Sequence, residues 1–96
     1  MKIPKTINIC GTVFIIRELD ATIKVGITKE SWGYIDYQES FINIYSKLEE
    51  QKKFKVLIHE IIHGCCEAAN IDITEKENDT LANILSDTLI RNNLLK

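Results

Sequence analysis

The stretch VLIHEIIHG, residues 56–64, contains both histidines of this 96-residue chain. His59 and His63 stand four residues apart, Glu60 follows the first of them, and most of their neighbours are apolar. On an α-helix, residues four apart point in nearly the same direction and lie about 6 Å apart along the axis. The stretch therefore predicts a largely buried helix that presents two imidazoles side by side.

Two imidazoles placed in this way can bind one metal ion, each nitrogen lying about 2.0–2.1 Å from it. Glu60 points about 100° further round the helix, beside such an ion rather than onto it. The pattern H-E-x-x-H is a signature of zinc metallopeptidases, in which the histidines are ligands and the glutamate is the general base. Zinc lowers the pKa of water and polarises a carbonyl group, while the glutamate moves the proton. The stretch predicts peptide-bond hydrolysis with one Zn²⁺ ion per chain.

The alternative is that both histidines are ordinary core residues. In apolar surroundings each imidazole, and the carboxylate between them, would then need its own hydrogen-bond partner. An unpaired buried polar group costs about 1–3 kcal/mol. A bound metal ion removes this requirement for both rings at once, so the pair favours metal binding.

The helix that carries the histidines is predicted to begin at a capping box, Ser46-Lys47-Leu48-Glu49, and to run to about Ala69. Its second half is apolar nearly all round, as expected of a buried helix. A second capping box, Thr74-Glu75-Lys76-Glu77, predicts another helix that ends near Asn92. We therefore expect two helices in the second half of the chain.

The first half of the chain is rich in β-branched and aromatic residues. Residues 6–19 form one such segment, which Gly11-Thr12 divides, and this predicts a hairpin or a bulged strand. GYIDY (33–37) and FINIY (41–45) predict a second hairpin, whereas residues 21–29 carry no clear pattern. The expected fold is a single α+β domain over residues 1–96, with a small, twisted, mostly antiparallel sheet of three to five strands packed on the two helices.

A catalytic zinc ion usually has three protein ligands and one open position, so a third ligand must be found. Cys66 and Glu67 follow the histidines on the same helix, but they lie about 10.5 and 12 Å from His59 along its axis. Both are too far away to share a metal ion with it. The acidic residues of the second helix remain as candidates, namely Glu75, Glu77 and Asp79.

The faces of the second helix rank these three candidates. One face carries Glu75, Asp79, Ala82, Ser86 and Leu89, and the small residues among them would let this helix lie close against the histidine helix. Glu77 lies nearer the opposite face and is also needed in its capping box. Glu75 is therefore ranked first, Asp79 second and Glu77 last. Asp79 has a second possible role, which is to orient a histidine through its other ring nitrogen. Acidic residues are also common in the first turn of any helix.

The charge and cysteine content of the chain bear on its partners. A formal net charge of −2 and scattered lysines predict no direct nucleic-acid partner. The longest apolar run is four residues, Val13–Ile16, which predicts neither a signal peptide nor a membrane anchor. Three cysteines, two of them adjacent, give no disulfide framework. We expect a cytoplasmic protein whose partner is a peptide or protein substrate.

Several segments together resemble a known family. MKIPKTINICGTVFII, GYIDY, INIY, EQKKFKVLIHEIIHG and a closing acidic helix with LANIL follow one another in the same layout as in small phage and prophage zinc metallopeptidases. These are distant relatives of the ImmA/IrrE-like proteins, within the zincin fold. The resemblance implies a bacterial host cell and a short curved sheet whose last strand flanks the active-site helix. It also implies zinc held by His59, His63 and a carboxylate of the last helix, with Glu60 as the catalytic acid and base.

The chain departs from this family at one position. ImmA/IrrE-like members have an E-x-x-A-N pattern in the last helix. Here Ala82-Asn83 matches, but the glutamate position holds Asp79. The third ligand therefore stays open between Glu75 and Asp79.

The substrate side of the site rests on less specific patterns. Residues 41–45 could form an exposed sheet edge that binds an extended peptide, or an ordinary strand with Phe41 or Ile42 in the core. Either Tyr37 or Tyr45 could stabilise the oxyanion.

A rival function is a metal-binding protein without turnover that acts through a protein partner. Another is a regulator of prophage switching that cleaves or captures a repressor.

Overall fold

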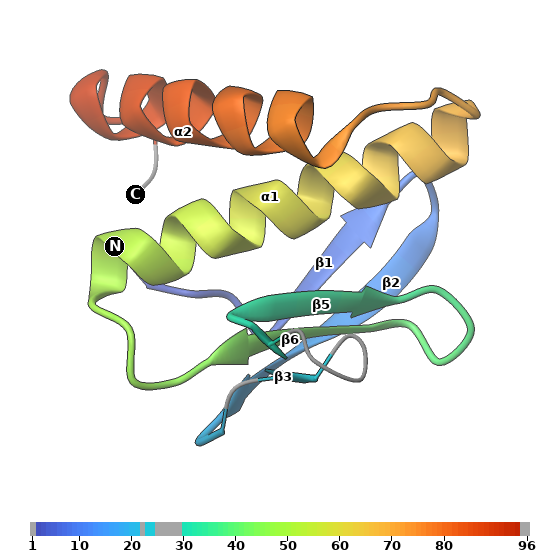
Figure 1. Cartoon of the computed structure of the whole chain (residues 1–96), viewed down its shortest axis with the longest axis horizontal. Helices are drawn as coiled ribbons and strands as arrows, with labels where there is room; N and C mark the ends of the chain where they lie inside the picture. Colours follow the sequence, from blue (N-terminus) through green and yellow to red (C-terminus); the bar gives the residue numbers. More distant parts are fainter. Residues whose placement is uncertain (1, 22, 25–29, 95–96) are drawn as a thin grey trace.

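The computed structural model describes residues 2–21, 23–24 and 30–94. They form a four-stranded mixed sheet, a separate two-stranded sheet and two helices. Figure 1 shows three layers: the larger sheet, the helix α1 (Glu50–Ala69) and the helix α2 (Glu75–Arg91), with α1 in the middle. The expected α+β class is confirmed.

The predicted N-terminal hairpin is present. The strand β1 (Thr6–Ile9) pairs antiparallel with β2 (Thr12–Leu19). Between them, Cys10 and Gly11 both have positive φ angles, 52° and 93°. A two-residue turn of this kind matches the natural twist of paired strands, and glycine adopts it without strain.

The second predicted hairpin is also present, as β5 (Gly33–Asp36) and β6 (Phe41–Tyr45) in antiparallel pairing. β6 additionally pairs with β2 in parallel, which gives the order β1-β2-β6-β5. The sheet is therefore mixed, with two antiparallel pairings and one parallel pairing. The small second sheet pairs β3 (Ile23–Lys24) with β4 (Glu30–Ser31). Of the segment without a clear pattern, residues 22 and 25–29 lie outside the described residues.

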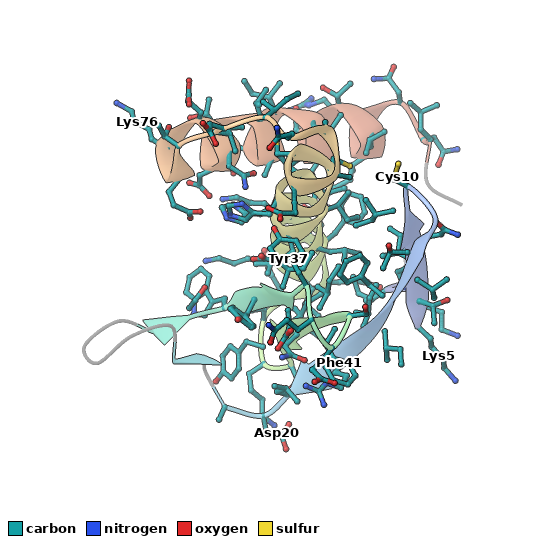
Figure 2. All side chains as sticks on the ribbon, turned by 90° about the vertical axis from the view of Figure 1, so that its right-hand side faces the viewer. Lys5, Cys10, Asp20, Tyr37, Phe41 and Lys76 are labelled. Carbon is teal, nitrogen blue, oxygen red and sulfur yellow. The ribbon has the colours of Figure 1, made fainter. Side chains whose placement is uncertain are left out.

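The prediction that residues 41–45 form an exposed sheet edge is wrong. β6 is an interior strand with β2 on one side and β5 on the other. Ile42 and Ile44 are fully buried, so the alternative of an ordinary core strand holds. Phe41 lies on the face away from the helices (Figure 2), where the Arg17 guanidinium stacks over its ring at 3.8 Å. The strand at the edge of the sheet on this side is β5.

The predicted start of α1 is also wrong. Ser46 still belongs to the hydrogen-bond ladder of the sheet, since its N–H donates to the Leu19 carbonyl at 2.7 Å. Its hydroxyl donates to the Asp20 carboxylate at 2.8 Å and is not available to cap a helix. The N-cap of α1 therefore lies three residues later, at Glu49, which makes no side-chain capping bond. The predicted end of α1 at Ala69 is confirmed.

α2 follows the prediction closely. The Glu77 N–H donates to the Thr74 hydroxyl at 3.1 Å, and the Thr74 N–H donates to the Glu77 carboxylate at 2.9 Å, which completes the capping box. The small-residue face packs on α1, with Ala82 and Ser86 buried. The opposite face leaves three large apolar side chains exposed, Leu81, Ile84 and Leu85.

Two apolar clusters fix α1 between its neighbours. The first lies between the sheet and α1 and consists of Ile9, Phe14, Ile16, Ile35, Ile42, Ile44 and Leu57. The second joins α1 to α2 through Phe54, Ile58 and Ala82. Because α1 is held on two sides, its orientation against α2 and β5 is well determined. Neither helix in the described ranges is long and apolar enough to cross a bilayer.

Candidate metal centre

His59 and His63 lie next to each other on the α1 surface that faces the start of α2. Their ring centroids are 4.9 Å apart and the ring planes meet at 74°. Both side chains are partly exposed rather than enclosed in the apolar core. One helical turn therefore brings the rings together, as the spacing predicts.

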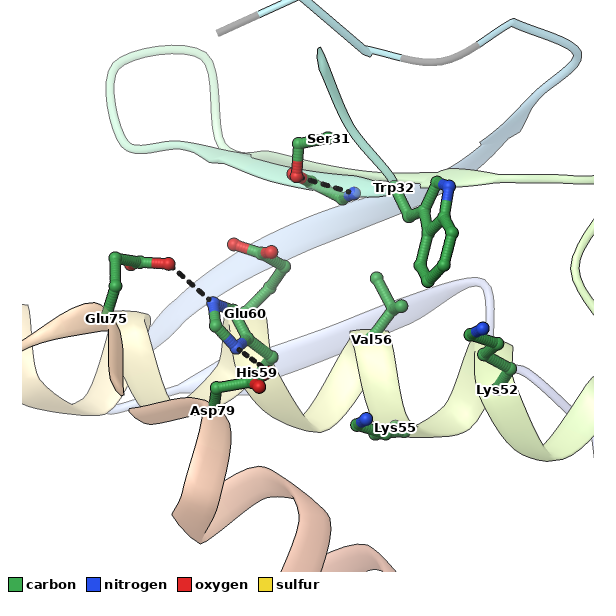
Figure 3. Close-up of a pocket in the computed structure, with 10 residues that line it drawn as sticks. Ser31, Trp32, Lys52, Lys55, Val56, His59, Glu60, Glu75 and Asp79 are labelled. Carbon is green, nitrogen blue, oxygen red and sulfur yellow. Dashed lines mark hydrogen bonds and ion pairs between the residues drawn. The ribbon is translucent and has the colours of Figure 1, made fainter. Parts of the chain in front are cut away.

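α2 contributes a carboxylate to both rings. The Glu75 Oε1 atom is 2.7 Å from His63 Nε2, and its Oε2 atom is 3.4 Å from His59 Nε2. One donor atom from each of these three residues lies within 4.8 Å of the others. Asp79 takes a different position, with Oδ1 at 3.7 Å from His59 Nδ1. Figure 3 shows Glu75 and Asp79 on two sides of the same imidazole ring.

This donor set could hold one divalent ion. Two ligands bound tetrahedrally at about 2.1 Å from zinc lie roughly 3.4 Å apart. Glu75 Oε2 already lies 3.4 Å from His59 Nε2, whereas Oε1 lies at the hydrogen-bond distance of 2.7 Å from His63 Nε2 and would have to move apart from it to share an ion. Burial lowers the pKa of His59, and this effect outweighs the opposing charge of Glu75. The ring is therefore neutral near pH 7 and can offer a lone pair. A carboxylate beside the other ring nitrogen, as Asp79 provides, is the usual partner of a metal-binding histidine.

The remaining candidates stand apart from this group. Glu77 is engaged with Thr74 in the capping box, and this bond lowers its pKa. In the part of the chain that the structure describes, the cluster of metal-type donors contains neither Glu77 nor the residues rejected on spacing, Cys66 and Glu67. Of the three acidic candidates, Glu75 is the one that joins the histidines in this cluster, and its role as third ligand stays a prediction.

Glu60 points from α1 towards the sheet and lines the cavities beside the histidines. Only 6% of its surface is exposed. Burial, and to a smaller extent the charge of Glu75, raises its pKa to about 8. A carboxyl group with a pKa near neutral pH can both accept and release a proton under ordinary conditions.

Gly33 allows β5 to approach this carboxylate closely. A Cβ atom at position 33 would lie 2.9 Å from Glu60 Oε2 and 2.5 Å from Val56 Cγ1. Sequence alone suggested only the start of a strand here. The close approach of β5 to α1 becomes visible only in the folded chain.

We expect Gly33→Ala to destabilise the protein by about 1–3 kcal/mol, because the added methyl group forces β5 away from α1. Urea denaturation measures this loss. Equal stability of Gly33→Ala and the unsubstituted protein would contradict the packing argument.

Two cavities meet at the candidate centre and share Ser31, Gly33, His59, Glu60 and Glu75. The first, about 290 Å³, extends towards Trp32 and the N-terminal half of α1. The second, about 410 Å³, extends towards Tyr34, Tyr37 and His63. A ligand bound at the shared residues therefore has room on both sides.

The structure distinguishes the two tyrosines that were proposed to stabilise the oxyanion. Tyr37 lines the second cavity, and Figure 2 shows its ring between the β5–β6 turn and α1. Burial, followed by the charges of Glu67 and Glu60, raises its pKa to about 12, so the phenol keeps its proton and can donate a hydrogen bond. Tyr45 pairs with Leu19 at the other end of β6 and lines neither cavity.

No family model, curated protein or solved structure matches the chain. The function therefore has to be inferred from the residues of the site and from the sequence motifs.

Asn78 is a site residue that the sequence analysis missed. It is fully buried in the contact of α2 with α1, and its side-chain amide donates to the His59 carbonyl oxygen at 3.2 Å. Its own carbonyl oxygen has no hydrogen-bond partner among the described residues. Asn78 thus ties the first turn of α2 to the α1 turn that carries the first histidine. Its spacing was a usable signal, since it lies three residues after Glu75 and four before Ala82 on the same face.

We expect Asn78→Ala to cost about 1–2 kcal/mol of stability, because it removes one hydrogen bond and leaves a small cavity. Zinc affinity should also fall, by about tenfold to a hundredfold, because Glu75 is no longer held over the histidines. Urea denaturation and titration with a competing zinc indicator measure the two effects. Asn83→Ala, at an exposed position of the same helix, should change neither quantity. A stable Asn78→Ala protein with normal zinc affinity would show that this contact does not position the site.

Proposed function

We propose that this protein is a zinc metallopeptidase of the zincin type. The observation that carries the proposal is the convergence of three donor atoms, from His59, His63 and Glu75, within 4.8 Å at a junction of two cavities. Glu60 supplies a buried carboxyl group at the same junction. The resemblance to small phage and prophage zinc peptidases supports the same assignment.

A zinc ion held by these donors would lower the pKa of water and polarise the carbonyl group of a peptide bond. Glu60 would take the proton from the attacking water and pass it to the departing amine. Asp79 would hold the His59 ring in the tautomer that leaves Nε2 free. Tyr37 would donate a hydrogen bond to the developing oxyanion.

The β5 edge is the best candidate for binding an extended substrate. The Tyr45 N–H donates to the Trp32 carbonyl, so the backbone groups of the next residue, Gly33, turn to the free side of β5. The Ser31 hydroxyl bonds both of them, donating to the Gly33 carbonyl at 2.8 Å and accepting from its N–H at 3.3 Å. A peptide strand added beside Gly33 would displace the Ser31 hydroxyl and take over these two bonds, next to residues that line both cavities.

The metal content of the protein tests this proposal. The protein is purified without a histidine tag or chelating resin and analysed by native mass spectrometry. We expect one zinc ion per chain and hydrolysis of unstructured protein substrates that stops on addition of a zinc chelator. Absence of zinc under all conditions of preparation, zinc supplementation included, would overturn the proposal.

A second candidate function is a metal-binding protein that acts by holding a protein partner, such as a repressor in prophage regulation. The exposed apolar residues Leu81, Ile84 and Leu85 on the outer face of α2 favour it, since contiguous apolar surface often marks a protein contact. The two functions differ in their need for Glu60. After Glu60→Gln, a binding protein would still bind its partner, whereas a peptidase would no longer hydrolyse its substrate.

A further inference from the structure

The first cavity has a basic wall next to the candidate metal centre. Trp32, Lys52 and Lys55 line it on the side away from Tyr37, and we call these three residues the basic shelf. Figure 3 shows Trp32 and Lys52 together beyond Val56, and Lys55 on the same stretch of α1. Their position relative to the histidines suggests what they bind.

The two lysines continue the face of α1 that carries the histidines. Lys55 lies four residues before His59 and Lys52 seven residues before it, which places them about 6 and 10.5 Å along the helix axis. Both side chains are half-buried. The Lys52 ammonium sits 4.0 Å from the centre of the Trp32 ring, a cation–π contact that keeps it at the cavity wall.

The shelf lysines differ from the lysine between them. Lys53 pairs with Glu18 at 2.6 Å and lines a different cavity. Lys52 and Lys55 form no ion pair with a carboxylate of the described residues. The acidic groups that share their cavity are Glu60, Glu75 and Asp79, and the last two contact His59 instead. The shelf therefore offers two ammonium groups to a ligand.

We propose that the basic shelf binds a carboxylate of the peptide substrate, placed two or three residues from the bond that is cleaved. This inference rests on the proposed peptidase function. An extended chain advances about 3.3 Å per residue, so two or three residues span the distance from the histidines to Lys55 and Lys52. Ammonium groups that are partly desolvated form charge-assisted hydrogen bonds with carboxylates. The substrate is thus an acidic segment or the last residues of a chain with a free carboxyl end.

The test uses zinc-loaded Glu60→Gln protein, so that binding is measured without turnover. The probes are fluorescent alanine-serine decapeptides with blocked ends and one Glu, with matched peptides carrying Gln or Lys instead. A further peptide with no acidic side chain and a free C-terminal carboxylate separates the two sources of the charged group. Fluorescence anisotropy gives the dissociation constants.

We expect a Glu peptide, or the peptide with a free C-terminus, to bind about tenfold more tightly than the Gln peptide. Adding Lys52→Gln and Lys55→Gln together should abolish this preference, while adding Lys53→Gln should leave it unchanged. Circular dichroism confirms that each variant is folded. Equal binding of all peptides, or a preference that survives the double substitution, would overturn the proposal that the basic shelf binds a carboxylate.

Parallel measurements of hydrolysis by the unsubstituted protein keep the two proposals separate. Cleavage without any preference for acidic peptides would overturn the shelf and leave the peptidase function intact. A lysine-dependent preference in binding, without any cleavage, would support the shelf as a carboxylate site and overturn the peptidase function.

Discussion

Replacing Glu60 by Gln should lower the rate of peptide hydrolysis by about a thousandfold and leave the zinc content unchanged. Removal of a general base typically costs a factor of 10²–10⁴. Glutamine has nearly the same shape but cannot accept the proton from water. Measuring kcat with zinc-loaded protein tests the catalytic part of the prediction. An unchanged rate would exclude Glu60 as the base, and zinc loss would show that it acts as a ligand.

The same substitution should stabilise the metal-free protein at alkaline pH. In the unfolded chain the Glu60 carboxyl ionises near its ordinary pKa of 4.5, whereas in the folded protein its pKa is raised to about 8. The buried carboxyl group therefore does not reduce the free energy of unfolding below pH 4.5. It reduces this free energy progressively between pH 4.5 and 8, and by its full amount above pH 8. A shift of this size corresponds to about 3–5 kcal/mol. Glu60→Gln removes the penalty, because the amide stays uncharged.

Urea denaturation in the presence of a chelator, at pH 5 and at pH 9, measures this effect. The gain in unfolding free energy from Glu60→Gln should be small at pH 5 and should reach several kcal/mol at pH 9. Glu67→Gln, at an exposed position of the same helix, serves as the matched control and should show no such gain. An equal effect of Glu60→Gln at both pH values would show that burial does not raise the pKa of this carboxyl group.

Local patterns predicted the parts of the fold that depend on neighbouring residues. The turn at Gly11, the capping box at Thr74 and the one-turn spacing of the histidines are all settled within a few residues. The box at Ser46 failed because distant groups, Leu19 and Asp20, compete for the same serine. Capping predictions hold only where the tertiary structure leaves the capping side chain free.

The remaining errors concern contacts between segments far apart in the chain. β6 pairs with β2 in parallel, and the residues of the segment FINIY do not indicate this partner. The position of β6 in the middle of the sheet was therefore missed. Gly33 and Asn78 owe their roles to the approach of β5 and of α2 to α1. The faces of α2 could rank Glu75 above Glu77, but only the folded position of its first turn shows which carboxylate meets the histidines.

Replacing His63 by Ala should lower zinc affinity by about a thousandfold. A tightly bound zinc ion contributes about 10–16 kcal/mol of binding free energy, so the loss of one of three ligands removes several kcal/mol. In zinc at a thousand times its dissociation constant, the unsubstituted protein gains about 4 kcal/mol of unfolding free energy. His63→Ala should gain almost none. Without metal, its exposed contact with Glu75 is worth less than 1 kcal/mol, so the difference measures zinc binding.

The same zinc titration, extended to the acidic residues of α2, identifies the third ligand. Glu75→Gln should lose zinc nearly as completely as His63→Ala, because its carboxylate approaches both histidines. Asp79→Asn should lose only about tenfold to a hundredfold, as expected for a group that orients His59 through its other nitrogen. Glu77→Gln should weaken the helix cap and leave zinc affinity unchanged. A stronger loss in Asp79→Asn than in Glu75→Gln would reverse the assignment and make Asp79, which stands at the glutamate position of the E-x-x-A-N pattern, the third ligand.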